Sequence, residues 1–329
     1  VVVTAPPDDG RVITSNGLPV TGYGHEGEPW ARQLFLELNA VRLVPEDFVA
    51  SRLADFRGRY VNIHDGRRDT YTPENPTLTV WFFGGSTMFG IGQRDDHTIP
   101  SVVAHLAERD GIRIRALNFG VSADVNWQEA LRFEQAINSG LTKPDLVVFY
   151  DGVNDWSSAF YRLDFGSTDP DRIERSPVSD EERAARRAAN PGKPLPPGPE
   201  RDALQIEIAA RQYARGVDTA TRLATSHGVP VVNFWQPIPQ TKVPRPSDDE
   251  LWNRIRFDPA LLAREAARYR AVATSSEVDP IDLTRTLDGL NVPVYLDWSH
   301  TNEMGARLIG ADIYRELQDR LARIAIARR

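Results

Sequence analysis

The chain of 329 residues contains no cysteine. Disulfide bonds, thiolate nucleophiles and cysteine-ligated metal ions are therefore excluded. Because proteins without disulfides work in reducing and oxidising compartments alike, the cysteine count does not indicate a location. The sequence begins at Val1 and shows no signal peptide. An extracytoplasmic origin, with an N-terminal targeting or anchoring segment ahead of this sequence, stays open.

Long apolar runs and basic stripes are also missing. No stretch reaches the roughly 18 apolar residues of a membrane-spanning helix. Basic residues number 39 against 46 acidic ones, and no basic stripe offers a surface to nucleic acid. No two histidines stand at a metal-binding spacing, and the cluster Asp95, Asp96 and His97 is typical of a solvated loop before a helix. We expect no nucleic-acid partner, no membrane span, no metal ion and no cofactor.

Short apolar segments alternate with amphipathic stretches along most of the chain. The apolar segments are LTVWFFGGS, IRIRALNFG, PDLVVFYDG, VPVVNFWQP and, more weakly, EVDPIDL. The spacing of apolar residues predicts helices over 98–109, 127–138, 204–227, 259–276 and 303–327. Strands that alternate with helices predict an α/β fold, with a parallel sheet covered on both faces.

The ends and one insertion depart from this alternation. Residues 1–27 indicate an extended arm, and 29–57 predict one or two helices before a strand-like piece, RYVNIHDG. We therefore divide the chain into an N-terminal arm and helical extension, 1–74, and a main domain, 75–329. Residues 156–203 are rich in charge and proline, which is typical of a disordered surface segment or of a lid over a substrate.

Polar residues follow the predicted strands directly. Ligands of open parallel sheets bind beyond the carboxyl ends of the strands. Ser86 follows two glycines behind the first strand, and Asn154 lies in YDGVND behind the third. Asp297 and His300 precede the last helix, three positions apart. These residues are the candidates for a functional site.

Each candidate alone has a structural explanation. Serine often caps helices, and Asn154 stands among turn-forming residues. Ser86 lacks the neighbouring lysine of a phosphate-binding loop, and Met88 stands where the nucleophile elbow of α/β-hydrolases has glycine. A hydrolytic serine needs a base and a carboxylate that orients the base, and Asp297 and His300 are such a pair. The combination therefore favours a serine nucleophile.

In this combination the sequence resembles the SGNH (GDSL-like) hydrolase family. Residues 84–90, Gly-Gly-Ser-Thr-Met-Phe-Gly, are similar to the family's Gly-Asp-Ser-x-x-x-Gly, with Gly85 in place of aspartate. Residues 152–155 fit Gly-x-Asn-Asp, and residues 297–300 fit Asp-x-x-His. The resemblance covers residues 75–325 and implies a flavodoxin-like three-layer α/β/α sandwich, with a central parallel sheet of about five strands.

The second motif of the family is incomplete. Its oxyanion glycine usually falls five residues after an asparagine, and counting from Asn118 this position is Ala123. A main-chain N–H does not require glycine unless the backbone angles do. The resemblance implies an oxyanion hole formed by the amide of Ser86, the amide of Ala123 or Gly120, and the side chain of Asn154.

The resemblance further implies that Ser86 attacks an ester carbonyl while His300, oriented by Asp297, accepts its proton. This would be a serine-dependent hydrolase of acyl or acetyl esters, acting on a small molecule or a glycan. An acyltransferase with the same triad and a catalytically silent carbohydrate-binding domain are the alternatives. Four aromatic residues near the motifs would suit either a sugar platform or the core: Phe89, Trp127, Trp156 and Trp298.

Overall fold

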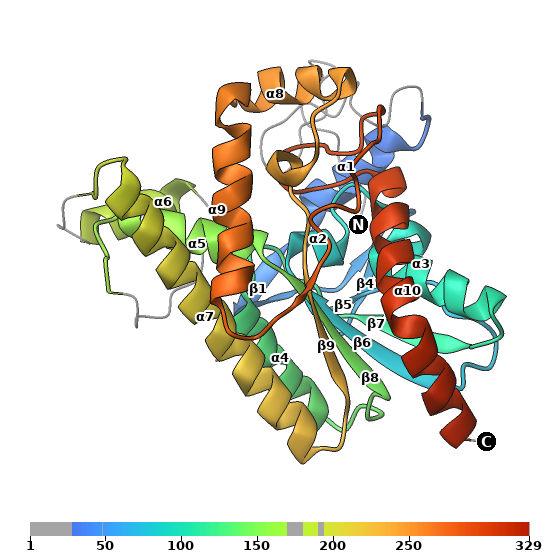
Figure 1. Cartoon of the computed structure of the whole chain (residues 1–329). Coiled ribbons are helices and arrows are strands. Elements are labelled where there is room, and N and C mark those ends of the chain that lie inside the picture. The colour runs from blue at the N-terminus through green and yellow to red at the C-terminus, as the bar shows by residue number, and fades with distance from the viewer. Residues whose placement is uncertain (1–27, 48, 170–179, 190–193, 329) are drawn as a thin grey trace.

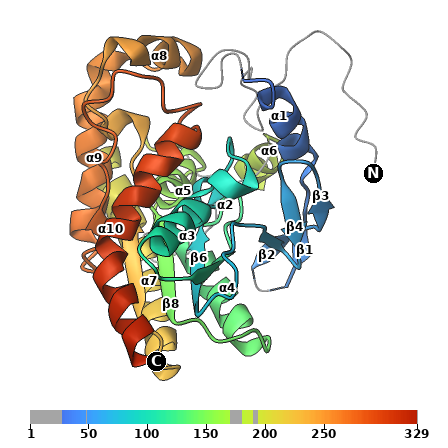
Figure 2. The same ribbon diagram turned by 90° about the vertical axis from the view of Figure 1, so that its right-hand side faces the viewer.

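The computed structural model describes residues 28–47, 49–169, 180–189 and 194–328. Within these ranges the chain forms a central sheet with helices packed on both faces, as Figures 1 and 2 show. The order of its eight strands is β10-β9-β8-β6-β7-β5-β4-β3. The architecture is therefore α/β, as the alternation of strands and helices predicts.

Five neighbouring strands are parallel, and each coincides with a predicted strand. Their order corresponds to the doubly wound flavodoxin-like arrangement, in which the switch point lies between the first and third strands along the chain, here β6 and β8. The strands are β6 (Leu78–Gly84), β7 (Ile114–Asn118), β8 (Leu146–Asp151), β9 (Val231–Trp235) and β10 (Ile281–Asp282).

The prediction of about five strands is correct only for this parallel part. Three short antiparallel strands extend the sheet beyond β7: β3 (Phe56–Arg57), β4 (Asn62–His64) and β5 (Arg67–Arg68). Because Arg68 pairs with Asn118 of β7, the predicted boundary at residue 75 falls within one sheet.

The N-terminal extension contains one helix in its described part, α1 (Ala31–Ala40). The prediction of one or two helices over 29–57 is met by this one, and after it β1 (Leu43–Glu46) pairs antiparallel with β2 (Ala50–Leu53) in a separate hairpin. Pro45 has no N–H for a helical hydrogen bond, and β-branched and aromatic residues around it favour strands.

Helices cover the predicted stretches. On one face of the sheet α3 packs against α10, and on the other α4 packs against α7, which also contacts α9 (Figure 1). None of the helices in the described ranges is both long and apolar enough to cross a bilayer. The bounds are α3 (Ile99–Arg109), α4 (Asn126–Asn138), α7 (Pro199–Ser226), α9 (Leu262–Ser275) and α10 (Glu303–Ala327).

Four helices were not predicted. Two of them occupy described parts of the 156–203 insertion, whose residues 170–179 and 190–193 lie outside the described ranges. The insertion is therefore helical over much of its described length, and its role as a lid stays a prediction. These helices are α2 (Ser86–Phe89), α5 (Val153–Asp164), α6 (Asp180–Ala189) and α8 (Asp249–Ile255).

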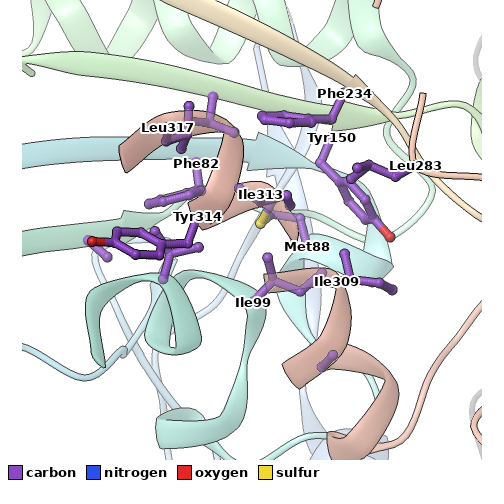
Figure 3. Close-up of a cluster of buried hydrophobic side chains, with 14 of the residues drawn as sticks. Phe82, Met88, Ile99, Tyr150, Phe234, Leu283, Ile309, Ile313, Tyr314 and Leu317 are labelled. Carbon is purple, nitrogen blue, oxygen red and sulfur yellow. The ribbon is translucent and has the colours of Figure 1, made fainter. Parts of the chain in front are cut away.

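The central strands are apolar on both sides because both faces of the sheet are covered. On one face Phe82, Tyr150 and Phe234 pack against side chains of α3 and α10 (Figure 3). Met88 of α2 is fully buried in the same cluster. The short helix at the end of β6 is therefore anchored in the core, and so is its first residue, Ser86.

Candidate active site

Ser86 is the first residue of α2, directly behind the carboxyl end of β6. The capping explanation is wrong, because Gly85 occupies the N-cap position. The Oγ atom of Ser86 lies 2.7 Å from Nε2 of His300. Its amide has no hydrogen-bond partner among the described residues. The chain therefore presents both a hydroxyl and an unengaged N–H at this turn.

His300 is held on its other side by Asp297. Its Nδ1 lies 2.7 Å from Oδ2 and 2.9 Å from Oδ1 of the carboxylate. Nδ1 must carry the proton in this contact, because an ionised carboxylate only accepts hydrogen bonds. Nε2 is then free of a proton and accepts the hydrogen bond of the Ser86 hydroxyl. This tautomer is the one a general base requires.

Asp297 is completely buried and remains acidic. Burial alone would raise the pKa of its carboxyl group, but the attraction to the protonated form of His300 and the hydrogen bonds from His300 and Ser299 outweigh this effect and lower the pKa below its ordinary value. The amides of Ser299 and His300 donate to Oδ1 at 3.0 and 2.9 Å. The turn 297–300 thus folds around its own carboxylate, which stays ionised at neutral pH.

Ala123 adopts the left-handed conformation that usually requires glycine. Its φ angle is +65°. For a residue with a Cβ atom this conformation is less stable than the right-handed one by about 1 kcal/mol. The amide of Ala123 has no partner among the described residues, whereas its neighbour Asp124 donates its amide to Val121. The backbone at position 123 therefore has a conformation that glycine adopts without strain, although the residue is alanine.

Gly120 has a different part in the structure. Its amide donates to Oδ1 of Asn118 at 2.9 Å, so this N–H is engaged within the protein. A Cβ atom at Gly120 would lie 2.8 Å from the carbonyl carbon of Met88, closer than real Cβ contacts allow. Glycine is thus needed for the close approach to α2. Of the two predicted amides, Ala123 alone is unengaged.

Asn154 lies next to this segment, in the first turn of α5. Its Nδ2 atom donates one hydrogen bond to the carbonyl oxygen of Asp124 at 2.7 Å. A Cβ atom at Gly85 would overlap Nδ2, so the side-chain amide occupies the space above Gly85. The structure thus brings Asn154 and the 123–124 segment to the residue that precedes Ser86.

Two sets of residues escaped the sequence-based prediction. Glu129 of α4, Asp151 at the end of β8 and Asp155 of α5 are buried. Burial raises the pKa of Glu129 and of Asp155, and raises that of Asp151 to about 6. The second set surrounds Arg68. Its ion pair with Asp95 corrects the prediction of a solvated loop for that residue, whereas Asp96 is exposed as predicted. Only Asp151 and Asp155 carried a signal, since both stand directly behind a strand.

The aromatic candidates differ in their surroundings. Phe89 is buried against the N-terminal extension, whereas Trp127 and Trp156 are half-buried. Trp298, between Asp297 and His300, is 45% exposed and meets the ring of Phe257 edge-on at 6.0 Å. Trp298 is therefore the one of the four that is open to a ligand. Within the described ranges, no three His, Asp or Glu side chains are placed to hold a metal ion.

Known proteins offer only distant similarity. No protein-family model and no curated protein matches the chain. Similar solved structures include an acetyl xylan esterase, with 15% identity over 73% of this chain and 100% of that chain and a TM-score of 0.43. An acetylxylan esterase from Geobacillus stearothermophilus gives 13% identity, coverages of 74% and 94% and a TM-score of 0.41.

A third similar structure is a putative lipolytic protein of the G-D-S-L family from Desulfitobacterium hafniense. It is 13% identical over 73% of this chain and 99% of that chain, with a TM-score of 0.37. Identities and TM-scores this low do not transfer a function to the chain. What it does must be inferred from its own residues.

Proposed function

We propose that the protein is a serine-dependent carboxylic-ester hydrolase with Ser86 as its nucleophile. The observation that carries the proposal is the unbroken hydrogen-bonded series from Ser86 Oγ through His300 to Asp297. These three side chains come from two segments 214 positions apart and satisfy one another in a buried site. A structural serine has no need of an imidazole that a buried carboxylate orients.

In the first half-reaction Ser86 Oγ bonds to the ester carbonyl carbon while His300 Nε2 takes the hydroxyl proton. Asp297 stabilises the resulting imidazolium. As the tetrahedral intermediate collapses, the C–O bond to the alcohol breaks and His300 gives its proton to the leaving oxygen. Water then attacks the acyl-serine with His300 again as the base, which releases the acid and restores Ser86.

The negative oxygen of the intermediate needs donors beside Ser86. We assign this role to the amides of Ser86 and Ala123 and to the side chain of Asn154. The unengaged state of both amides supports the assignment, as does the position of Asn154 over Gly85. Removing one such donor costs about 3–4 kcal/mol of transition-state stabilisation.

The substrate that fits best is an ester with a short acyl group on a small molecule or a glycan. Ser86 is only 7% exposed and His300 only 4%, which favours acyl groups small enough to enter. Trp298 stands between Asp297 and His300 in the sequence and is exposed, so we propose that its ring contacts the alcohol part of the ester.

The test is hydrolysis of a panel of short-chain and long-chain aryl esters and acetylated sugars. Ser86→Ala is compared with wild type and with the control Ser226→Ala, which alters an exposed serine at the end of α7. We expect Ser86→Ala to abolish turnover and stoichiometric labelling by a fluorophosphonate, and the control to retain both. Wild-type rates in Ser86→Ala would contradict the proposal.

The same assay separates the alternatives. An acyltransferase shares the acyl-enzyme, so added alcohol or sugar would divert acyl groups from water to the acceptor. A silent carbohydrate-binding domain would leave Ser86 unlabelled and the esters intact. For a hydrolase we expect release of free acid that added acceptor does not suppress.

A further inference from the structure

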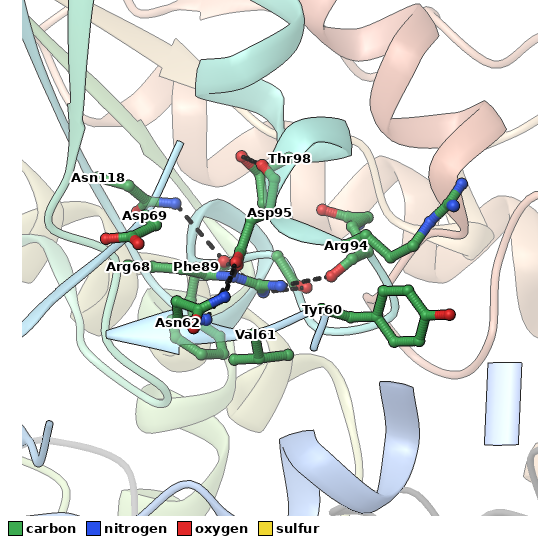
Figure 4. A network of polar contacts seen from close by, with 12 residues as sticks. Tyr60, Val61, Asn62, Arg68, Asp69, Phe89, Arg94, Asp95, Thr98 and Asn118 are labelled. Carbon is green, nitrogen blue, oxygen red and sulfur yellow. Dashed lines mark hydrogen bonds and ion pairs between the residues drawn. The ribbon is translucent and has the colours of Figure 1, made fainter. Parts of the chain in front are cut away.

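Arg68 is a buried cation outside the residues of the triad. It lies on β5 of the N-terminal extension, and its side chain is fully inaccessible to solvent. Figure 4 shows Arg68 among Asn62, Phe89 and Asp95. Nη1 donates to the carbonyl oxygens of Phe89 and Gly90 at 2.9 and 2.7 Å, and Nη2 donates to that of Gln93. Nε donates to Asp95 at 3.0 Å.

These bonds hold residues 90–95, which we call the bridging loop. The last carbonyl groups of a helix lack partners within it, and α2 ends at Phe89. Arg68 satisfies the carbonyl of Phe89, and Asn118 Nδ2 donates to that of Met88 at 2.9 Å. Since Arg68 and Asn118 pair across β5 and β7, the sheet itself holds the end of the helix that begins with Ser86.

The other side of the bridging loop contacts the segment that carries His300. Gln93 Nε2 donates to the carbonyl oxygen of Thr301 at 2.8 Å. Arg94 forms two hydrogen bonds of 2.7 Å with the carboxylate of Glu303. The bridging loop therefore joins the helix that begins with Ser86, through amides that donate to the Ser86 carbonyl, to the segment that directly follows His300.

We propose that Arg68 is a positioning residue that sets the distance between Ser86 Oγ and His300 Nε2 through the bridging loop. This inference rests on the proposed function, because it assigns Arg68 a part in the same reaction. Arg68 itself does not touch the reacting atoms. Its fork of donors holds three carbonyl groups and one carboxylate at once, which the single ammonium of lysine does not match.

The test compares Arg68→Lys with Arg67→Lys, the same change at the preceding residue of the same strand. Arg67 is an apt control because its side chain pairs with Asp65 and makes no hydrogen bond to the bridging loop. Each variant is titrated with a fluorophosphonate, and kcat and KM for a short-chain aryl ester are expressed per reactive site.

We expect Arg68→Lys to lower kcat per site by about 10- to 100-fold with KM within about twofold of wild type, since a misplacement near 1 Å costs about that much. Arg67→Lys should match wild type. A merely structural role would reduce the number of reactive sites or the melting temperature but leave kcat per site unchanged. That second pattern would overturn the inference.

A second variant perturbs the same link from the other side and guards against misfolding of Arg68→Lys. Gln93→Met preserves the volume of a buried side chain and removes the bond to Thr301. We expect it to lower kcat per site in the same way. In the double variant with Arg68→Lys, the loss of transition-state stabilisation calculated from kcat per site should be smaller than the sum of the losses in the two single variants, because both changes act through the bridging loop. Additive losses, or none, would contradict the inference.

Failure of the proposed function can be distinguished from failure of the positioning role of Arg68. Wild-type protein that neither hydrolyses esters nor reacts with the fluorophosphonate would overturn the function. The Ser86 Oγ–His300 Nε2 separation in crystals of the two lysine variants would still decide the positioning role. We expect the contact to lengthen beyond hydrogen-bond range in Arg68→Lys only, and an unchanged contact there would refute it.

Discussion

Gly85 leaves the space in which the Asn154 amide lies, and Gly85→Ala should therefore disable the oxyanion hole without touching the triad. A Cβ atom at position 85 would lie 3.3 Å from Cγ of Asn154 and would overlap Nδ2. Ordinary contact begins at 3.4 Å, so the amide nitrogen must withdraw by a distance on the order of 1 Å. It would then also leave the Asp124 carbonyl, to which it is bonded at 2.7 Å.

The expected loss follows from the role of one donor. Removing a single oxyanion donor lowers kcat by about 10²- to 10³-fold, and a displaced donor should lie near the lower end of that range. The φ of Gly85 is −78°, an angle that alanine adopts readily, so the folded state should survive. The assay is steady-state hydrolysis of a short-chain aryl ester, with the melting temperature measured in parallel.

A double variant separates this mechanism from damage to Ser86. Asn154→Ala should lower kcat by about as much as Gly85→Ala, and adding Gly85→Ala to it should cost little more, because the colliding amide is gone. Wild-type kcat in Gly85→Ala would refute the placement of the donor. If Gly85→Ala lowers kcat in the Asn154→Ala background as much as it does in wild type, the added Cβ atom acts on Ser86 instead.

Three further changes test other parts of the site. Ala123→Gly should raise the free energy of unfolding, measured by urea denaturation, by up to about 1 kcal/mol, because glycine adopts a φ of +65° without strain. The main-chain amide is retained, so kcat should not change. A large loss of activity would contradict this prediction. Asp151 has a pKa raised to about 6 by burial, above an unfolded value near 4, so its stabilising contribution is full below about pH 4 and is lost as the pH rises through about 6. The difference in unfolding free energy between wild type and Asp151→Asn should fall over that interval. A difference independent of pH would refute the raised pKa of Asp151. Trp298→Ala should raise KM for aryl and sugar esters by about tenfold with a small change in kcat and melting temperature, because we propose that its exposed ring contacts the alcohol part of the ester. An unchanged KM would remove Trp298 from the binding surface.

Much of the fold follows from local patterns. The strands β6 and β8 are apolar on both faces and bounded by turn residues, so their signal is strong, whereas β10 has two residues and a weaker signal. The strands β3 and β5 have two residues each and β4 has three, too few to show a period of two. Their existence depends on pairing with one another and with β7, which no local pattern records.

The candidate site likewise contains residues that local patterns predict and residues that depend on contacts between distant segments. Ser86, Asn154, Asp297 and His300 stand in short motifs whose spacing is visible along the chain. Arg68 lies in a charged run, IHDGRRD, that is typical of solvent-exposed surface. Its burial arises only when the bridging loop folds over it, because carbonyl groups from a segment more than twenty positions away supply its partners.

The separation of 214 positions between Ser86 and His300 has a consequence for the newly made protein. His300 follows every strand of the described sheet, and α10, which packs on α3, follows His300. The proposed nucleophile and both proposed oxyanion amides are therefore synthesised well before the proposed base. Contacts so distant along the chain form late in folding. If the proposed function holds, Ser86 stays inactive on the ribosome, and hydrolysis begins only after His300 and α10 have emerged and packed against the sheet.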